Sequence, residues 1–245
     1  MNHSDKLRSR LRHNGLQKMY FEGRNKPRMK PSGSPYLRRH VAELMAFAQI
    51  QPEDTVLEVG CGMGRYTLLL AEMGVKVTGL DLSGVLLERL RKYNQRDYEI
   101  PLVVGDIMDP PVALYGRFDA VIGFFTLHHL YDIGQSMAAM ARLLKKDGGR
   151  IVFLEPNAFC PLYYVQIAFT PGMSWQGERG VAKMRAGVIE EAMRRAGLTA
   201  AEPQRFGVFP PFIANMRGGA PLERVLERNP LWGPFLPFQL FKGVW

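Results

Sequence analysis

The segment Val56-Leu-Glu-Val-Gly-Cys-Gly-Met-Gly-Arg65 decides the fold. An apolar run that is typical of a strand enters a G-x-G-x-G turn, and a helical pattern follows over residues 65–73. Glycines let the backbone bend tightly and let a ligand approach it closely. The helix N-terminus behind the turn offers free N–H groups. The segment therefore predicts a strand–turn–helix unit with a nucleotide-type ligand beyond the carboxyl ends of the strands.

Short apolar runs alternate with helical patterns after residue 54, as in a mainly parallel sheet covered on both faces. Strands are predicted over residues 55–59, 75–80, 102–104, 118–122 and 150–154, with a terminal strand within 238–245. Helices are predicted over residues 65–73, 84–93, 133–145 and 188–196. Ser83 is the expected N-cap of the second helix. The pattern predicts a doubly wound α/β fold.

The charge of the chain is unevenly distributed. The chain has 245 residues, 47% of them hydrophobic, and a net charge of +9. Residues 1–40 hold eleven Lys or Arg and two acidic residues, so they carry the whole excess, and residues 41–245 are neutral. The length fits one large domain or two small ones, and the apolar fraction excludes a disordered chain. A disulfide scaffold is excluded by the count of 2 Cys, which suits a reducing cytosol.

The basic segment also bears on location. No apolar stretch of about 7–15 residues follows the basic start, so we expect no secretory signal. Pro27, Pro31 and Pro35 disfavour a mitochondrial transit peptide. No run of about 20 apolar residues occurs, so we expect no transmembrane helix. The sequence predicts a cytoplasmic protein, with contact at a membrane surface as an additional option.

Asp81 strengthens the ligand prediction because it ends the second strand, 21 residues after Gly60. An acid at this place can accept hydrogen bonds from both hydroxyls of a ribose. A dinucleotide fingerprint would require glycine at position 65, where this chain has Arg65. The spacing therefore disfavours NAD or FAD.

Five segments in order resemble the class I S-adenosylmethionine-dependent methyltransferases, in the group that includes small-molecule and quinone-biosynthesis enzymes. The segments are LEVGCGMGR (57–65), GLDLS (79–83), VVGDIMD (103–109), FDAVIGFFTLHHL (118–130) and LLKKDGGRIVFLEPN (143–157). The resemblance covers about residues 54–200. It implies a Rossmann-like doubly wound sheet of seven strands with the last antiparallel, and S-adenosyl-L-methionine as cofactor.

The resemblance also implies a set of cofactor-binding residues: Glu58, Gly60, Cys61, Gly62, Gly64, Asp81, Leu82, Asp106, Ile107 and Phe124. The glycine loop would lie under the methionine moiety, with Glu58 orienting it. Asp81 would hold the ribose and Asp106 the adenine amino group. Leu82 and Ile107 would lie against the adenine, and Phe124 would contact the methionine amine through its backbone.

Three residues are candidates for a general base. His128 and His129 follow the fourth strand, and Glu155 ends the fifth, so all three are expected to face the cofactor crevice. A base would contribute ~10²–10⁴ where the acceptor must lose a proton. The alternative for the histidines is that one of them only caps the following turn. The five His otherwise lack ligand spacing, so no metal is predicted.

The remaining segments concern the acceptor. Residues 1–50 are predicted to form a basic arm and a helical lid, and residues 51–245 the methyltransferase domain. Within that domain, residues 156–186 form a long apolar insertion, as a lid over an apolar or aromatic small-molecule or lipid-like acceptor would. The alternative is that the insertion packs its own small core or a homodimer interface.

Three further hypotheses stay open. The arm could track the phosphates of RNA or DNA, although the segment Phe124-Phe-Thr-Leu-His-His lacks the Asn/Asp-Pro-Pro-aromatic motif of amino-directed nucleic-acid methyltransferases. The arm and the aromatic tail, residues 230–245, could instead contact a membrane surface. A catalytically silent scaffold with a methyltransferase fold is the third hypothesis.

Overall fold

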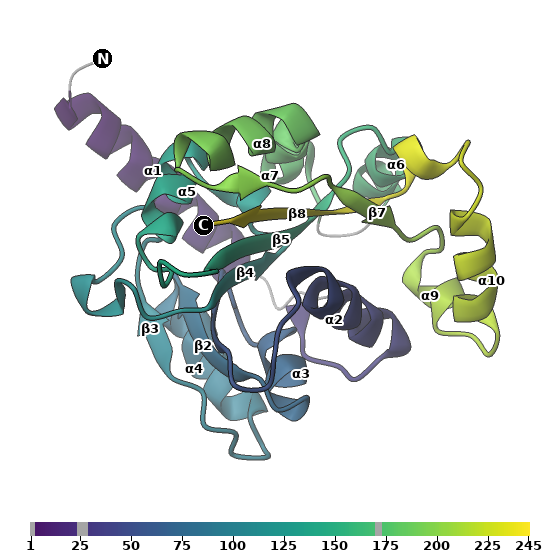
Figure 1. The fold of residues 1–245 in the computed structure, drawn as a ribbon, viewed down its shortest axis with the longest axis horizontal. Helices are drawn as coiled ribbons and strands as arrows, with labels where there is room; N and C mark the ends of the chain where they lie inside the picture. The colour runs from purple at the N-terminus through teal and green to yellow at the C-terminus, as the bar shows by residue number, and fades with distance from the viewer. Residues whose placement is uncertain (1–2, 24–28, 170–172) are drawn as a thin grey trace.

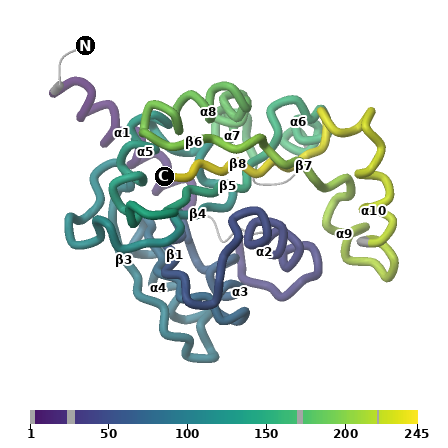
Figure 2. Tube along the Cα trace, viewed as in Figure 1, coloured from purple at the N-terminus to yellow at the C-terminus, as the bar shows by residue number. Residues whose placement is uncertain are grey.

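A single mixed sheet organises the protein (Figures 1 and 2). The structure, a computed structural model, describes residues 3–23, 29–169 and 173–245, so Arg24, Lys26 and Arg28 of the basic arm lie outside it. Along the chain the elements are α1 (His3–Glu22), α2 (Pro35–Ala48), β1 (Thr55–Val59), α3 (Thr67–Glu72), β2 (Lys76–Asp81), α4 (Gly84–Tyr93), β3 (Leu102–Val104), η2 (Val112–Leu114), β4 (Ala120–Phe124), η3 (Leu127–His129), α5 (Ile133–Ala141), β5 (Arg150–Pro156), α6 (Pro161–Phe169), α7 (Trp175–Glu178), η4 (Arg179–Lys183), α8 (Ala186–Arg195), β6 (Thr199–Ala200), β7 (Gln204–Phe206), α9 (Pro211–Ala214), α10 (Gly219–Glu227), η5 (Gly233–Phe235) and β8 (Phe238–Val244).

The strand order confirms the doubly wound, Rossmann-like prediction. The order is β3-β2-β1-β4-β5-β8-β6, and β1 pairs in parallel with both β2 and β4. The direction of winding therefore reverses between β1 and β4, where open α/β sheets bind their ligands. β8 runs antiparallel to β5, from Arg150 opposite Val244 to Pro156 opposite Phe238, which confirms the expected antiparallel last strand.

The sheet holds eight strands where seven were expected. The additional strand arises because β6 and β7 pair with the same edge of β8, at opposite ends of it. Residues 201–203 separate them and include Pro203, which has no N–H to donate. The edge strand is therefore interrupted. The six strands predicted by range correspond to β1–β5 and β8, whereas β6 and β7 were not predicted.

Helices cover both faces of the sheet. α2 and α3 pack on one face and α5 and α8 on the other, while α4 contacts β2 and β3. Leu37, Val41 and Leu44 of α2 are fully or almost fully buried, and their spacing gives the helix one apolar stripe. Ser34 caps α2 by accepting a hydrogen bond from Leu37 N. The sequence had indicated only a helical lid in this segment.

The predicted and observed boundaries of the elements agree best where a capping residue defines the end of a helix. α4 spans Gly84–Tyr93 as predicted, and Ser83 Oγ accepts from Leu86 N. β4 lies two residues later than predicted, and α5 ends at Ala141 rather than at residue 145. Both differences have one cause, because Phe118 pairs with Leu144 in an isolated bridge and exchanges backbone hydrogen bonds with Leu143 and Lys145. Tertiary pairing here overrides the local helical pattern.

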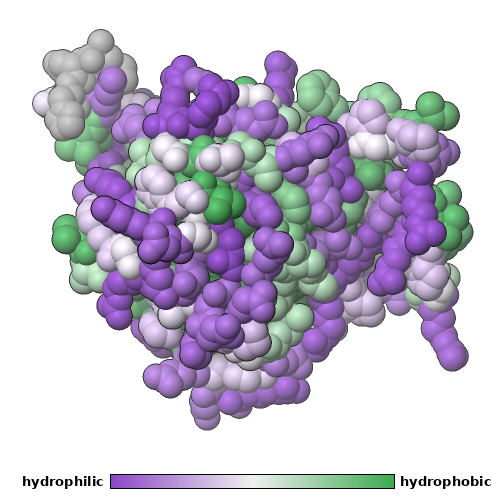
Figure 3. All heavy atoms as spheres, in the orientation of Figure 1, coloured by the Kyte–Doolittle hydropathy of each residue, from purple (hydrophilic) through white to green (hydrophobic). Residues whose placement is uncertain are grey.

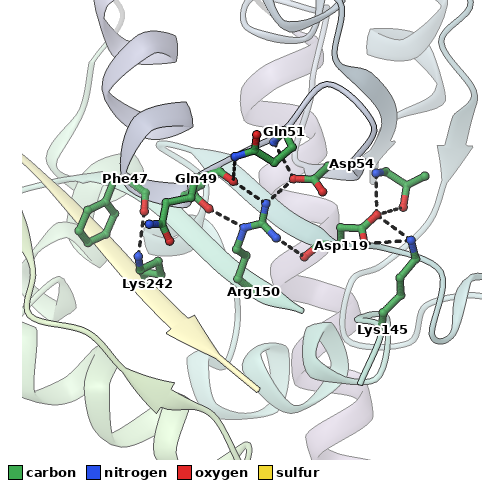
Figure 4. Close-up of polar contacts among 10 residues, drawn as sticks. Phe47, Gln49, Gln51, Asp54, Asp119, Lys145, Arg150 and Lys242 are labelled. Atoms are coloured by element: carbon green, nitrogen blue, oxygen red, sulfur yellow. Dashed lines mark hydrogen bonds and ion pairs between the residues drawn. The ribbon is translucent and has the colours of Figure 1, made fainter. Parts of the chain in front are cut away.

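Polar side chains tie the elements together at the amino ends of β4 and β5 (Figure 4). The Arg150 guanidinium donates to the carbonyls of Ala48 and Gln49 and pairs with Asp54. Asp119 accepts hydrogen bonds from the N–H and hydroxyl of Thr55, at 2.8 and 2.7 Å, and from Lys145 at 2.7 Å. These contacts fix the edge of the sheet opposite to the ligand-binding edge.

Among the described residues, no helix combines the length and the apolar character that a membrane span requires.

The contacts of Asp119 predict an acid-sensitive contribution to stability. Although partial burial acts to raise the pKa of Asp119, the hydrogen bonds from Lys145 and Thr55 lower it to about 2. The stabilisation is therefore full above the unfolded pKa of about 4 and is lost as the pH falls toward about 2. Asp119→Asn should lower the free energy of unfolding by about 1–2 kcal/mol near neutral pH. Urea denaturation should show that this difference shrinks in acid.

The matched control is Asp147→Asn, because Asp147 is exposed and lies two residues after Lys145 in the segment that follows α5. This control should leave the free energy of unfolding unchanged at both pH values. An equal loss in the two variants would contradict the assigned role of Asp119.

Candidate functional site

A cavity of about 450 Å³ lies over the carboxyl ends of β1, β2 and β4. Its size falls within the range of small-molecule sites, about 300–1,000 Å³. It joins two halves with different walls. One half is formed by the glycine loop and the acids at the ends of β1 and β2, and the other by aromatic residues of α2, β4 and β8.

The glycine loop adopts the backbone conformation that only glycine readily provides. Gly60 has φ of +71° and Gly62 has φ of +54°. A Cβ on Gly60 would lie 2.4 Å from Thr126, whereas a Cβ on Gly62 would meet no atom within 4 Å. The loop is therefore packed on one side and leaves room beside Gly62, on the wall of the cavity.

Gly64 shapes the loop from the side away from the cavity, and its place in the cofactor-binding set stays a prediction. It is not among the residues that line the cavity, and a Cβ there would lie 2.7 Å from the side chain of Leu90. Gly64, with φ of +88°, permits close packing of the loop against α4. Gly60, Cys61 and Gly62 do line the cavity.

Asp81 and Asp106 lie on the cavity wall. Asp81 accepts one hydrogen bond on each carboxylate oxygen, from Gly62 N and Ser83 N, both at 2.8 Å. Because a carboxylate can accept about four hydrogen bonds, Asp81 retains capacity for two ligand hydroxyls. Asp106 accepts from Met108 N at 2.9 Å. Leu82 and Ile107 line the wall beside these acids.

Glu58 is a buried carboxylate whose ionised form a positively charged partner would stabilise. It is 2% exposed and lines the cavity, and its Oε2 has no hydrogen-bond partner among the described residues. Burial, reinforced by the charge of Asp81, raises the pKa of Glu58 to about 7. A buried unpaired charge is unfavourable, so an ammonium group in the cavity would stabilise its ionised form.

Helix α1 covers the acidic half, which sequence reasoning did not predict in detail. Asn14 donates to Asp106 at 2.8 Å, and Arg10 pairs with the same carboxylate at 3.4 Å. Ser83 Oγ donates to Glu22, and His13 lies 2.8 Å from the carbonyl of His129. The inward face of α1 is thus polar and complements the acids at the ends of the strands.

The three candidate catalytic residues meet in one network. Glu155 is fully buried at the end of β5 and accepts from Thr126 N and Leu127 N at 2.8 and 2.6 Å. Its second oxygen lies 2.5 Å from His128 Nδ1. Since a carboxylate only accepts, this contact assigns the Nδ1 proton to His128 and leaves Nε2 on the cavity side, where His128 and His129 both line the wall. Glu155 does not line the wall, so it orients His128 from behind.

Glu178 is a functional candidate that sequence reasoning missed. Its Oε2 lies 3.4 Å from His128 Nε2 and accepts from Tyr163 at 3.2 Å. Two glycines bring it there, because a Cβ on Gly177 would lie 2.7 Å from the ring of Tyr20, and one on Gly180 would lie 1.7 Å from the carbonyl oxygen of His128. The pattern Gly-Glu-x-Gly inside the apolar insertion was the available signal.

The charge state of His128 follows from this network. Burial alone would lower its pKa, but the charges and hydrogen bonds of Glu155 and Glu178 outweigh burial and raise the pKa to about 9. His128 is therefore an imidazolium near neutral pH, held between two carboxylates. His128, His129 and Glu178 also place possible metal-ligating atoms within 4.8 Å of one another. Their hydrogen bonding accounts for this proximity, and the expectation of no metal stays a prediction.

The other half of the cavity is aromatic. Tyr66 stacks on Phe124 with ring centroids 4.1 Å apart, and its hydroxyl lies 3.0 Å from His40 Nδ1. Burial lowers the pKa of His40 well below its usual value, so the ring is neutral. Tyr36 and Phe238 complete this wall. The predicted insertion contributes to the cavity as well, through Tyr163, Gln166, Met173 and Glu178.

Comparison with known proteins agrees with this geometry. Residues 56–148 match a family model described as a methyltransferase domain. The chain is 31% identical over 135 residues to an S-adenosyl-L-methionine-dependent Diels-Alderase of Talaromyces variabilis, covering 50% of this chain and 44% of the relative. It is 34% identical over 116 residues to a demethylmenaquinone methyltransferase of Tropheryma whipplei, covering 45% and 46%. The chain thus spans less than half of these relatives.

Solved structures share the fold. The structure of magnesium protoporphyrin IX methyltransferase from Synechocystis, solved with S-adenosylmethionine bound, superposes with a TM-score of 0.59 at 14% identity and covers 95% of this chain and 96% of its own. Sheet order, glycine loop and matched segment place the protein in the α/β methyltransferase fold class. The matched segment and the curated relatives support a class I S-adenosylmethionine-dependent methyltransferase domain in this chain.

The residues present fit the cofactor of this family, S-adenosyl-L-methionine. The unpartnered Oε2 of Glu58 suits the methionine ammonium, and the acceptor capacity of Asp81 suits the ribose hydroxyls. Of the predicted cofactor-binding set, all residues except Gly64 line the cavity. Phe124, Leu82 and Ile107 are among them.

The network around His128 makes a prediction about its titration. Glu155→Gln should lower the pKa of His128 from about 9, because the substitution removes the nearer negative charge. Nuclear magnetic resonance of the His128 ring nitrogens would report the value. Since the folded pKa lies above the unfolded value of 6.5, the stabilisation is full below about pH 6.5 and is lost as the pH rises through about 9.

Glu178→Gln serves as the comparison for this prediction. It should lower the pKa of His128 less, because Glu155 makes the closer contact. A pKa of His128 that stays near 9 in Glu155→Gln would contradict the assignment.

Proposed function

We propose that the protein transfers a methyl group from S-adenosyl-L-methionine to an apolar or aromatic small molecule, or to a lipid-like acceptor, by in-line displacement. The observation that carries the proposal is the single cavity in which acids, an oriented histidine and an aromatic wall meet. The demethylmenaquinone and ubiquinone methyltransferases among the relatives act, by their names, on small molecules.

In the acidic half of the cavity, each residue has a binding role. Asp81 would accept hydrogen bonds from the ribose hydroxyls, and Glu58 would hold the methionine ammonium. The open side of Gly62 would let the ligand lie against the backbone. When bound, the cofactor supplies a methyl group already activated by a sulfonium. The protein therefore needs mainly to align the reacting atoms, at roughly 3–3.5 Å, and to exclude water. Helix α1 covers this half and contributes to the exclusion of water.

His128 is the residue placed to receive the proton that the acceptor loses. Its Nδ1–H is held by Glu155, so Nε2 is the basic atom, and the pKa of about 9 makes it a strong base once it is deprotonated. The bound cofactor would supply the methyl group and keep the electrons of its carbon–sulfur bond. Nε2 of His128 would take the proton that the acceptor loses.

The aromatic half supports the proposed acceptor class. Tyr36, Tyr66, Phe124 and Phe238 form an apolar wall, and His40 offers a neutral polar ring within it. A wall of this composition favours a flat or apolar molecule over a nucleic-acid backbone. Nucleic acid stays the second candidate acceptor, and a homodimer stays a prediction. We also propose a cytoplasmic location, supported by the two free thiols, Cys61 and Cys160.

The cofactor assignment predicts the effect of Asp81→Asn. Loss of the charged acceptor should weaken binding of S-adenosylmethionine and S-adenosylhomocysteine about 10–100-fold. Isothermal titration calorimetry measures this directly. Asp109→Asn is the matched control, because Asp109 is exposed and lies outside the cavity wall. Absence of cofactor binding by the unmodified protein would favour the silent scaffold instead.

The proton-transfer assignment predicts a pH profile. Turnover should rise with pH toward about 9, as the base form of His128 accumulates. His128→Asn should lower turnover ~10²–10⁴ with little change in S-adenosylhomocysteine affinity. The assay is S-adenosylhomocysteine formation with a panel of phenolic, carboxylic and long-chain hydroxyl acceptors. His129→Asn should have the smaller effect, because Glu155 orients the ring of His128.

Two outcomes would contradict this assignment. Equal turnover in His128→Asn and the unmodified protein would remove His128 from the reaction. Binding of the cofactor together with conversion of an acceptor, but without S-adenosylhomocysteine formation, would mean that the cofactor is held without methyl transfer.

A further inference from the structure

Helix α10 has the reverse polarity of an ordinary surface helix, with acidic side chains toward the protein and apolar side chains toward solvent. Its acids face inward, with Glu223 only 2% exposed, whereas Leu222 and Val225 on its outer face are 54% and 62% exposed. A helix on the surface of a globular protein normally buries its apolar side chains and exposes its charges. The arrangement of α10 therefore suits an apolar environment outside the protein.

Ion pairs hold α10 in this orientation. Arg39 of α2 pairs with both Glu223 and Glu227. Glu223 also accepts from Val208 N and Phe209 N, both at 2.7 Å, and Glu227 accepts from Gly207 N at 2.6 Å. The contacts of Glu223 and Glu227 therefore hold this face of α10 against the protein. Leu222 and Val225 point outward as a consequence of these contacts.

Exposed apolar side chains continue beyond α10 at the same end of the molecule. Figures 1 and 2 show α6, α9, α10 and the connection from α10 to β8 at the end away from the free tip of α1, and green apolar surface is visible there in Figure 3. Asn157 donates to the carbonyls of Pro234 and Leu236, which joins the start of α6 to η5. We call this surface the apolar end; its exposed apolar side chains include Phe159, Leu162, Phe212, Leu222, Val225 and Leu231.

The exposed charge of the apolar end is positive. Within residues 211–235 the only acids are Glu223 and Glu227, which face inward, and the basic residues are Arg217, Arg224 and Arg228. These three arginines are exposed, and no carboxylate of the described residues pairs with them. Apolar side chains interspersed with unpaired arginines complement an anionic lipid surface, where the rings and aliphatic groups enter the headgroup layer and the arginines meet phosphates.

The cavity reaches the same end. Pro211 of α9 and Gln166 of α6 belong to its wall, and their neighbours Phe212 and Val165 are exposed. We propose that the apolar end docks on an anionic lipid bilayer and that the cavity takes its acceptor from that bilayer. The second part rests on the proposed methyl transfer to an apolar acceptor, whereas the docking itself does not.

Vesicle sedimentation of the full chain tests the docking. The unmodified protein should sediment with vesicles of equal parts phosphatidylcholine and phosphatidylglycerol, and much less with phosphatidylcholine alone. The double variant Leu222→Ser/Val225→Ser should partition roughly tenfold or more weakly, because binding scales with the apolar area that enters the interface. Arg224→Gln/Arg228→Gln should weaken binding only to the anionic vesicles.

The matched control removes equivalent apolar side chains from the opposite end. Leu11→Ser/Met19→Ser changes two residues of α1 that are 58% and 72% exposed, and vesicle binding should be retained. Unmodified protein that stays in the supernatant would overturn the proposal. Equal loss in the α1 control would assign the contact to the basic arm instead.

Two further measurements keep the result unambiguous. Gel filtration gives the oligomeric state of the unmodified protein and of Leu222→Ser/Val225→Ser. A dimer in the former and a monomer in the latter, with vesicle binding by neither, would assign the apolar end to a second copy. That result would overturn the proposal. Calorimetry with S-adenosylhomocysteine should give the same affinity in all variants, because none of them changes the cavity wall. Failure of vesicle binding with intact cofactor binding would therefore count against docking alone, and not against methyl transfer.

Discussion

The buried carboxylate of Glu155 is the interaction on which the site depends. A fully buried carboxylate must be surrounded by donors, and here the donors are two consecutive backbone N–H groups after β4 and the ring of His128. This requirement fixes the path of the chain where it leaves the sheet. It also accounts for Phe125, a non-glycine residue held at φ of +53° just before these donors. One charge thus sets the floor of the cavity and the orientation of the His128 ring, whose Nε2 lies toward Glu178.

A second consequence of buried charge is the role of α1. The ends of β2 and β3 place Asp81 and Asp106 close to Glu58, so the acidic half of the cavity concentrates negative charge. Arg10 and Asn14 offset part of that charge from outside. The basic excess of residues 1–40 is therefore partly a complement to the cofactor half, while the leucines of α1 remain exposed. A polar inward face explains why this helix shows no apolar periodicity in the sequence.

Sequence reasoning succeeded where function and local geometry share the same residues. The glycine loop, Asp81 and the Ser83 cap are short-range features, because a turn with positive φ or a helix start is decided by a few neighbouring residues. It failed where the partner lies far along the chain. Glu178 reaches His128 across 50 residues of sequence, and His40 reaches Tyr66 from a helix that precedes the sheet. The packing of Gly64 against Leu90 was not predicted, because a glycine that packs against a side chain looks the same in sequence as one that faces a ligand.

Helix α2 joins the aromatic half of the cavity to the apolar end. Successive residues of a helix point about 100° apart, so Arg39, His40 and Val41 face three different neighbours. Arg39 holds the acids of α10, His40 lies in the cavity wall, and Val41 packs into the core beside the sheet. The position of α10 and the shape of the acceptor half are consequently set by one rigid helix.

The segment that matches the methyltransferase family, residues 56–148, contains the glycine loop, Asp81, Asp106 and His128 but stops before Glu178. The aromatic half takes Tyr66 and Phe124 from that segment, while other parts of its wall come from α2, the insertion and β8, which lie outside it. A shared fold does not fix the ligand that a site binds. The non-cofactor wall of this cavity depends in part on α2, the insertion and β8, which the matched segment does not include.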